Sequence, residues 1–387
     1  MRRDLVLTAV LAVAAIVAGW IGWSGNLLLL PASCAFALIW SKAPNRMAVL
    51  IVSAAYFLTA SRGLPLGVQQ FYSTDVWPGL IFWLAASVSF VLVHLAAWSK
   101  RSAWRPFGFL VAMFLMAVPP LGITGWAHPL TASGILFPGW GWWGLVAMTA
   151  GLMGLATRMG PAVAVALTGF WLWSAAIWTD PKLPATWRGV DLEMGPSLGR
   201  DATLKRQRDL IATVHEIASQ GAGFIVLPES ALGFWTPTLG SFWKKSLHGR
   251  GVTVMAGAAV LDSSGYDNVL LMIDGDGSDI LYRERMPVPV SMWRPWDPWI
   301  GERGAARAHF FANPVVEVGK RRIAPLICYE QLLVWPVLQS MLAGADVVVA
   351  VGNGWWTAGS SIVDIQRANV AAWASLFGIP LVISFNT

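Results

Sequence analysis

The sequence is poor in charged residues and in cysteine. Of its 387 residues, 12% are Asp, Glu, Lys or Arg and 56% are apolar, and the mean hydropathy is +0.57. Because average proteins hold about 25% charged residues, this composition excludes a disordered chain and is unusual for a water-soluble globule. The two cysteines exclude a disulfide framework and a cysteine-based metal site, so we expect no cofactor and no metal.

Acidic residues are nearly absent from the first 178 residues. That part holds nine Lys or Arg and two Asp, for a net charge of +7, whereas residues 179–387 hold eighteen basic and nineteen acidic residues, for a net charge of −1. The net charge of +6 for the whole chain thus lies in its apolar part, and it gives no support to direct nucleic-acid binding. We predict a transmembrane bundle over residues 1–178, a linker over 179–187 and a water-compatible domain over 188–387.

Long apolar runs fill the first part. Seven of them approach the length that crosses a bilayer core of about 30 Å, and they are Leu5–Trp23, Leu27–Trp40, Met47–Ala60, Val76–Trp98, Pro106–Gly125, Ile135–Ala156 and Met159–Trp178. Lys and Arg concentrate in alternate loops, which by the positive-inside rule predicts a cytoplasmic N-terminus and an extracytoplasmic second part. A cleaved signal peptide over residues 1–23 is the alternative for the first run.

No run carries an acidic residue at its middle, which argues against an ion-coupled transporter. His94 and Cys34 lie within or beside the runs, and we expect both to pack inside the bundle.

The second part has the pattern of an α/β domain. We predict helices over 201–220, 331–342 and 362–377, and strands over 187–192, 224–227, 252–261, 268–273, 279–283, 323–328, 346–351 and 381–385. The acidic turn between the fourth and fifth strands lacks the ligand spacing of a calcium loop.

Three segments place reactive groups at strand ends. Glu229 follows an apolar strand, Cys328 follows another and precedes a helix, and Arg283 and Arg285 follow Tyr282 at the end of the hairpin. A carboxylate base beside a thiol, with a cation to stabilise negative charge, is what attack on an amide or ester carbonyl requires. A helix N-terminus would also favour the thiolate of Cys328. The alternative is that Cys328 is a buried core thiol.

The combination of apolar spans with Leu-Pro-Glu-Ser at 227–230, Ile-Cys-Tyr-Glu at 327–330 and Gly-Asn-Gly-Trp-Trp at 352–356 resembles bacterial apolipoprotein N-acyltransferase. That enzyme is a membrane-embedded member of the carbon–nitrogen hydrolase (nitrilase) superfamily, and the likeness covers nearly the whole chain. It implies an αββα sandwich on the periplasmic side of the inner membrane. It also implies roles for residues here: Glu229 as general base, Cys328 as nucleophile, Glu330 as supporting acid, and Asn353 and Trp356 as lining of the site.

The sequence departs from the acyltransferase pattern at two places. The family has a Lys two residues after Tyr282, completing a Glu-Lys-Cys triad, and this chain has Glu284 there, flanked by Arg283 and Arg285. Where the family has Phe-Gly-Glu, this chain has Val-Ser-Met at 290–292, and it ends at 387 where the family continues with a last span. Arg replaces the charge of Lys but does not readily exchange a proton. The divergent form is more similar to the conjugal transfer relatives of the enzyme encoded on Ti-type plasmids.

The loop over residues 292–299 carries Trp293, Trp296 and Trp299 among prolines and charges. Such a segment suits contact with lipid headgroups or an acyl chain, and the alternative is packing against the bundle.

Three functional hypotheses follow. The first is a membrane-anchored nitrilase-superfamily protein associated with conjugal transfer, with Cys-dependent acyl transfer or amide or ester hydrolysis at the periplasmic membrane face. The second is a genuine apolipoprotein N-acyltransferase, and the third is a non-enzymatic membrane scaffold of the conjugation apparatus. A phospholipid or acyl chain and conjugation-apparatus proteins are the expected partners.

Overall fold

The computed structural model describes residues 2–124, 126–195 and 203–387, and the chain packs into two compact units. The helical unit comprises the chain up to Pro181 together with residues 332–335 and 359–378. The α/β unit comprises residues 182–331, 336–358 and 379–387. This partition differs from the predicted domains, because residues 332–335 and 359–378 pack with the helical unit although they come late in the sequence.

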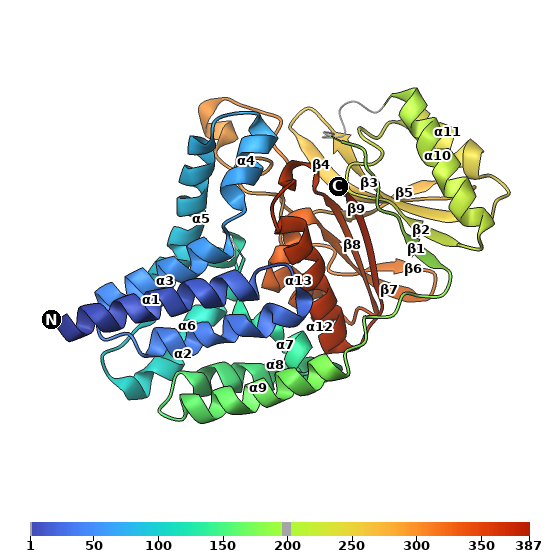
Figure 1. Ribbon diagram of the computed structural model, residues 1–387. Coiled ribbons are helices and arrows are strands. Elements are labelled where there is room, and N and C mark those ends of the chain that lie inside the picture. Colours follow the sequence, from blue (N-terminus) through green and yellow to red (C-terminus); the bar gives the residue numbers. More distant parts are fainter. Residues whose placement is uncertain (1, 125, 196–202) are drawn as a thin grey trace. The chain divides into compact units, whose positions relative to one another are not determined.

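The helical unit is built from ten α-helices within the described residues (Figure 1). They are α1 (Arg2–Gly22), α2 (Ala35–Ser41), α3 (Arg46–Ala60), α4 (Leu64–Tyr72), α5 (Val76–Ala97), α6 (Arg105–Ala117), α7 (Ser133–Leu136), α8 (Gly141–Leu155), α9 (Gly160–Ala176) and α13 (Ile362–Phe377). α13 packs closely on α7: a Cβ atom on Gly134 would lie 1.7 Å from the carbonyl oxygen of Ala372.

Two or three helices, instead of the seven runs predicted, are long and apolar enough to cross a membrane. In the described part of the chain these are α1 and α5, with α3 and α4 forming a third if their 49° bend lies within one span. The other runs break at proline or glycine, such as Pro119 and Gly139, and leave shorter helices. α8 has 15 residues, which at about 1.5 Å per residue is well short of a bilayer core of about 30 Å.

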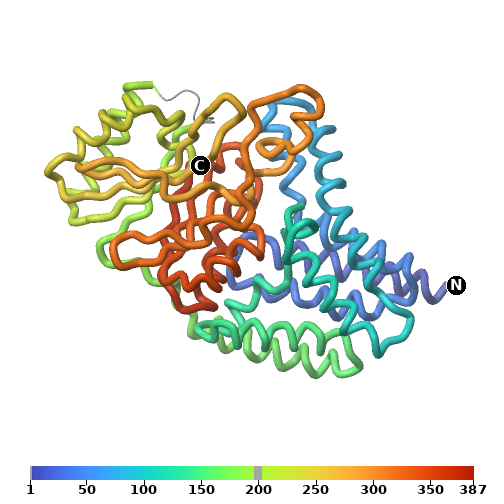
Figure 2. Tube along the Cα trace, turned by 180° about the vertical axis from the view of Figure 1, so that it is seen from behind, coloured from blue at the N-terminus to red at the C-terminus, as the bar shows by residue number. Residues whose placement is uncertain are grey.

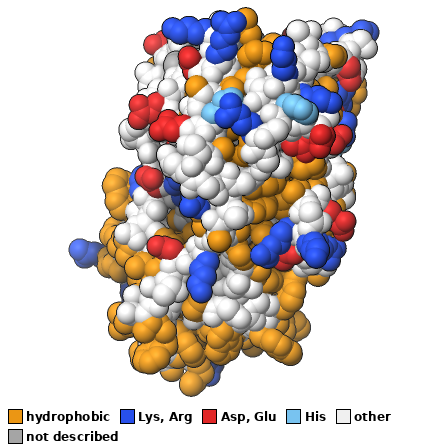
Figure 3. All heavy atoms as spheres, turned by 90° about the vertical axis from the view of Figure 1, so that its right-hand side faces the viewer, with side chains coloured by type: hydrophobic (Ala, Val, Ile, Leu, Met, Phe, Trp, Pro, Cys, Tyr) orange, Lys and Arg blue, Asp and Glu red, His pale blue; other side chains and the backbone are white. Residues whose placement is uncertain are grey.

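The helical unit exposes many large apolar side chains. They include Leu5, Val10, Trp77, Ile81, Phe114, Trp143, Val165 and Trp173, each at least 60% exposed. Figure 3 shows one face of the molecule, on which charged side chains are dispersed over the upper part and hydrophobic ones gather below. Large exposed apolar side chains in this number are typical of surfaces that contact a membrane or another protein.

The interior of the helical unit is an aromatic cluster. Phe36 stacks on Tyr56 with ring centroids 4.2 Å apart, and the His94 ring lies edge-on at 5.1 Å from Phe36. His94 and Cys34 are both buried here, as expected of packed rather than accessible groups.

The α/β unit contains two sheets. The first has the order β1 (Trp187–Gly189), β2 (Phe224–Val226), β3 (Thr253–Leu261), β4 (Tyr266–Ile273) and β5 (Ser278–Arg283), parallel over β1 to β3 and antiparallel after that. The second has the order β6 (Val316–Val318), β7 (Arg321–Ile327), β8 (Val347–Asn353) and β9 (Leu381–Asn386), with β7 to β9 parallel.

The two sheets pack face to face through an apolar layer that includes Val226, Leu270, Ile327, Val349 and Val382. The other face of the first sheet is covered by α10 (Leu204–Ser219) and α11 (Pro237–Leu247), and Figure 2 shows these helices on the outer side of the strands. α12 (Val334–Leu342) lies beside the second sheet (Figure 1). The predicted layered α/β sandwich is thus present.

Local chemistry sets the helix boundaries. The side chain of Thr203 caps α10 by accepting the backbone N–H of Arg206, and α13 is followed by Gly378, whose φ of 64° suits a glycine after a helix. α13 coincides with its predicted range, and the predicted strands recur with shifted ends. Residues 201 and 202 of the predicted helix over 201–220 lie outside the described residues. The sequence analysis missed α4, α11 and β6.

Candidate active site

The predicted reactive residues meet at the carboxyl ends of parallel strands. Glu229 follows β2, Cys328 follows β7 and Asn353 ends β8, while Glu284 follows the antiparallel strand β5. Because the two sheets pack face to face, these ends come from both layers. Ligands of α/β proteins bind preferentially at this end of the strands.

Glu229 is 4% exposed, so its carboxyl group is almost completely buried. Its Oε1 accepts a hydrogen bond of 2.8 Å from Nδ2 of Asn268, a residue of β4. Burial raises the pKa of Glu229 to about 7, against lowering contributions from Asn268, the Cys328 thiol and the backbone N–H of Asn353. A base whose pKa lies near neutrality can both take and return a proton.

Glu284 occupies the position at which the acyltransferase pattern has a Lys, and it is fully buried. Its Oε2 accepts the second hydrogen bond of the Asn268 amide, also 2.8 Å long. Burial, followed by the negative charges of Glu229 and Glu330, raises the pKa of Glu284 well above its ordinary value. The side-chain amide of Asn268 therefore hydrogen-bonds two carboxyl groups, those of Glu229 and Glu284. The acyltransferase pattern has one carboxylate and one cation at these two positions.

Cys328 stands at the turn between β7 and a 3-10 helix over Cys328–Leu332. Its φ is +43°, a left-handed backbone conformation that non-glycine residues adopt at a cost of order 1–3 kcal/mol and that clusters at active sites. The predicted thiolate is wrong for this environment: burial, followed by the charges of Glu229 and Glu284, raises the pKa of the Cys328 thiol well above its ordinary value. The thiol consequently needs a base at the moment of attack, and Glu229 is the carboxylate whose hydrogen bond to it contributes to that shift.

Glu330 ties the two sheets together. Its Oε1 accepts hydrogen bonds from the Tyr282 hydroxyl at 2.6 Å and from the backbone N–H of Arg285 at 2.7 Å, and its Oε2 accepts the N–H of Ile327 at 2.8 Å. A carboxylate with this many donors is fixed in place. It holds the backbone of Ile327, the residue before Cys328, and its role as supporting acid stays a prediction.

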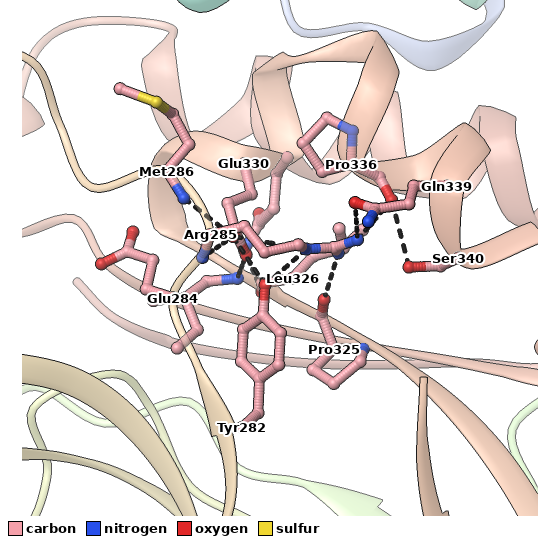
Figure 4. A network of polar contacts seen from close by, with 12 residues as sticks. Tyr282, Glu284, Arg285, Met286, Pro325, Leu326, Glu330, Pro336, Gln339 and Ser340 are labelled. Carbon is pink, nitrogen blue, oxygen red and sulfur yellow. Dashed lines mark hydrogen bonds and ion pairs between the residues drawn. The ribbon is translucent and has the colours of Figure 1, made fainter. Parts of the chain in front are cut away.

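The guanidinium of Arg285 is fully buried and serves this same network, which Figure 4 shows. Nε donates to Tyr282 Oη at 2.8 Å, and the terminal nitrogens donate to the carbonyl oxygens of Pro336 and Pro325 and to Gln339 Oε1. In the same view the carboxyl group of Glu284 extends away from this network. Arg285 thus contacts backbone carbonyl oxygens and Glu330. The cation predicted at this position would instead turn toward the Cys328 thiol.

Arg283 lies in a different, partly exposed ion cluster. Its side chain is 41% exposed, and its Nε lies 3.0 Å from Oδ2 of Asp267. Arg307 and His309 bind the other oxygen of the same carboxylate, at 2.7 and 2.9 Å. The structure therefore brings Glu229, Glu284 and Cys328 together and directs both predicted cations elsewhere.

Asn353 and Trp356 lie at the end of β8. The side chain of Asn353 accepts a hydrogen bond of 2.7 Å from Asn386, the last residue of β9, and the Trp356 indole donates to the carbonyl oxygen of Asn353 at 2.9 Å. These contacts hold the backbone N–H of Asn353 near Glu229 and Cys328, whose pKa values it lowers. Their predicted lining role stays a prediction.

The tryptophan loop, residues 292–299, lies between β5 and β6 in the sequence. The Trp293 ring lies edge-on to Phe310 with centroids 5.4 Å apart, and Trp296 is 36% exposed. Trp299, Ile300 and Phe311 are 85%, 62% and 71% exposed.

Asn268 is the functional residue that sequence reasoning missed. It is a buried amide at the start of an apolar strand, 3% exposed, and that pattern is the one signal that could have singled it out. Its importance arises from two carboxyl groups that are 39 and 16 residues away in sequence.

The sequence profile of the carbon–nitrogen hydrolase family matches residues 58–375. The chain belongs to the carbon–nitrogen hydrolase family. It is 65% identical, over its full length and that of the relative, to a probable conjugal transfer protein TraB of Sinorhizobium fredii. It is also 57% identical to the conjugal transfer protein TraB of Agrobacterium fabrum, with 100% of this chain and 94% of that protein covered.

Among solved structures, an amidase from Nesterenkonia sp. AN1 is similar over 52% of this chain and 77% of its own, at 15% identity and a TM-score of 0.38.

Proposed function

We propose that this protein is a membrane-anchored carbon–nitrogen hydrolase that forms a thioester at Cys328 and then transfers or hydrolyses the acyl group. The observation that carries the proposal is a thiol in a strained left-handed turn that shares a buried site with Glu229. In the reaction the Cys328 sulfur attacks an amide or ester carbonyl while Glu229 accepts the thiol proton. Glu229 then returns the proton to the leaving amine or alcohol.

Membrane anchoring is supported by α1 and α5 and by the apolar side chains that the helical unit exposes. The excess of Lys and Arg over acidic residues before residue 178 favours a multi-pass protein of the bacterial inner membrane, with a cytoplasmic N-terminus and a periplasmic α/β unit.

A lipid or acyl-chain substrate is supported by the tryptophan loop and the residues that follow it. Trp299, Ile300 and Phe311 are largely exposed apolar side chains in the α/β unit, and aromatic residues are favoured at the membrane–water interface. A role in plasmid conjugation, with conjugation-apparatus proteins as partners, is supported by the full-length similarity to conjugal transfer proteins.

The chain offers a matched pair of cysteines for the test. Both thiols are buried and outside any disulfide, one in each unit. The purified full-length protein in detergent is incubated with p-nitrophenyl hexanoate, and the acylated species is measured by intact-protein mass spectrometry. We expect one hexanoyl group on the parent and on Cys34→Ala, and none on Cys328→Ala.

Glu229→Gln should slow acylation by about 10²–10⁴-fold, because an amide cannot accept the thiol proton. Acylation that survives Cys328→Ala, or that is absent from the parent, contradicts the proposal.

The scaffold hypothesis is favoured by one observation, the direction of Arg283 and Arg285 away from the thiol. It predicts normal conjugation frequencies for Cys328→Ala, whereas the enzyme predicts their loss.

A further inference from the structure

Asn268 joins two buried carboxyl groups through a single NH2 group. Its Nδ2 lies 2.8 Å from Oε1 of Glu229 and 2.8 Å from Oε2 of Glu284. An amide NH2 has two hydrogens, so both bonds form together. The second oxygens, Oε2 of Glu229 and Oε1 of Glu284, are buried and have no further hydrogen-bond partner in the described part of the chain.

The charges around Glu284 do not allow both groups to ionise. The titratable and charged groups that surround this residue are Glu229, Tyr282, Arg285, His309, Cys328 and Glu330. Arg285 is engaged with Tyr282 and with carbonyl oxygens, and the His309 ring binds Asp267. The described residues turn no cation toward the pair, and two adjacent carboxylates repel each other, so the pair retains a proton.

We assign the shared proton to Glu284, because its carboxyl group is fully buried and accepts one side-chain hydrogen bond within the described residues, from Asn268. Glu229 is slightly exposed and receives three lowering contributions, so its pKa is about 7. Glu284 is fully buried, receives one such contribution, and has its pKa raised well above the ordinary value. At neutral pH the site thus contains an ionisable base and a neutral acid.

We propose that neutral Glu284 is the hydrogen-bond donor that stabilises the oxyanion during attack by Cys328, in the place that a cation holds in the family pattern. This inference rests on the proposed function. The donor is the proton on Oε1, the oxygen that no described residue engages. A neutral carboxylic acid held in an apolar site can donate such a bond to a developing oxyanion.

The steps balance as follows. The Sγ–carbonyl carbon bond forms, the thiol proton moves to Glu229, and the carbonyl electron pair becomes the oxyanion that accepts the Glu284 hydrogen bond. When the oxyanion collapses, the carbon–oxygen or carbon–nitrogen bond breaks and the leaving group takes the proton from Glu229. Glu284 keeps its proton throughout, and an amine or water completes the cycle at the thioester.

The test is the pH dependence of acylation by p-nitrophenyl hexanoate, measured by intact mass between pH 5 and pH 10 in full-length protein. We expect a bell-shaped profile for the parent, because acylation needs ionised Glu229 and protonated Glu284. Glu284→Gln keeps an N–H donor at the same place, so its rate should stay within about tenfold of the parent and its alkaline fall should vanish. Glu284→Ala should lower the rate by about 10²–10³-fold.

The exposed residue Glu317 supplies the control, and Glu317→Gln should reproduce the parent profile. A second readout does not depend on a variant's rate. Infrared difference spectra between parent and Glu284→Gln at pH 9, where Glu229 with its pKa of about 7 is ionised, should show the C=O stretch of a protonated carboxylic acid in the parent alone.

The outcomes separate the two proposals. A parent that is not acylated at Cys328 removes the enzymatic function and this inference with it. A parent that is acylated at Cys328, with a rate that rises to pH 10 or is unaffected by Glu284→Ala, overturns the role of Glu284 alone. The same holds if Glu284→Gln is as slow as Glu284→Ala, because an ionised carboxylate would then be the required form.

Discussion

Arg283 and Arg285 are separated by one residue and lie in opposite surroundings. The side chain of Arg283 is 41% exposed, and that of Arg285 is fully buried with a carboxylate and several carbonyl oxygens around it. Arg283 ends β5 and Arg285 lies two residues after it, so composition and spacing alone do not show that their surroundings differ. Burial distinguishes the two guanidinium groups, because a buried charge is strongly destabilising when it loses a partner.

This contrast predicts different losses of stability. Arg285→Ala leaves Glu330 buried without its cation and should lower the free energy of unfolding by about 3–5 kcal/mol. Arg283→Ala removes a partly exposed ion pair and should cost about 0–1 kcal/mol. Chemical denaturation of both variants in the same detergent measures the difference, and equal losses would contradict the buried network of Figure 4.

The raised pKa values of Glu229 and Glu284 predict how the free energy of unfolding varies with pH. The pKa of Glu229 rises from 4.5 to about 7 on folding, so the folded state holds a proton that the unfolded chain releases at lower pH. Stability from this group is complete below pH 4.5 and is lost as the pH rises through about 7. The melting temperature should therefore fall over this range, and Glu284→Gln should flatten the fall above pH 7 because it removes the second acid. An unchanged slope in Glu284→Gln would contradict a raised pKa for Glu284.

Residue chemistry was partly visible in the sequence. Glu229 and Cys328 could be predicted as reactive residues, because each directly follows an apolar strand. The state of the thiol could not be predicted, since it depends on carboxyl groups brought close by other strands.

At the scale of elements, the position of Glu229 depends on a close approach between β3 and the turn after β2. A Cβ atom on Gly257 would lie 2.5 Å from the Cα of Glu229 and 2.6 Å from the backbone nitrogen of Ser230. Only glycine permits this approach, because the atoms that would clash are backbone and cannot rotate away.

Gly257→Ala should therefore displace Glu229 and slow acylation of Cys328 by about 10²-fold, as misplacement of a catalytic group by about 1 Å does. Gly277→Ala is the control, since a Cβ atom there meets nothing within 4 Å. Equal rates in the two variants would show that the turn tolerates the shift.

Element prediction succeeded where the pattern is local. The strands of the α/β unit and α13 follow from apolar runs bounded by turn residues. The apolar runs before residue 178 were overcounted as spans, because apolar composition does not show where Pro119 or Gly139 ends a helix. α11 was not predicted, although it is amphipathic and buries Trp243 and Leu247.

At the scale of the whole molecule, the number of spans decides the side of the membrane on which the α/β unit lies. With a cytoplasmic N-terminus, an odd number of crossings places that unit outside and an even number places it inside. Seven spans, or three with α3 and α4 joined, give a periplasmic unit, and two spans give a cytoplasmic one.

We expect the periplasmic orientation. Lys100, Arg101 and Arg105 then lie in an inner loop if the shorter apolar helices also cross the membrane, and outside if α1, α3 with α4, and α5 are the crossings. An alkaline phosphatase fusion after Trp178 should be active, and an inactive one would place the α/β unit in the cytoplasm. A fusion after Lys100 should be inactive with seven crossings and active with three.

The sequence by itself determined the two-part character of the protein, the strands of its α/β part and its membership of the carbon–nitrogen hydrolase family, because these depend on composition and on neighbouring residues. Only the tertiary structure showed that Asn268 holds Glu229 against Glu284 and that Arg285 serves Glu330. The physical reason is that protonation and hydrogen bonding depend on distance and burial, which arise when strands far apart in sequence share one edge of a folded sheet.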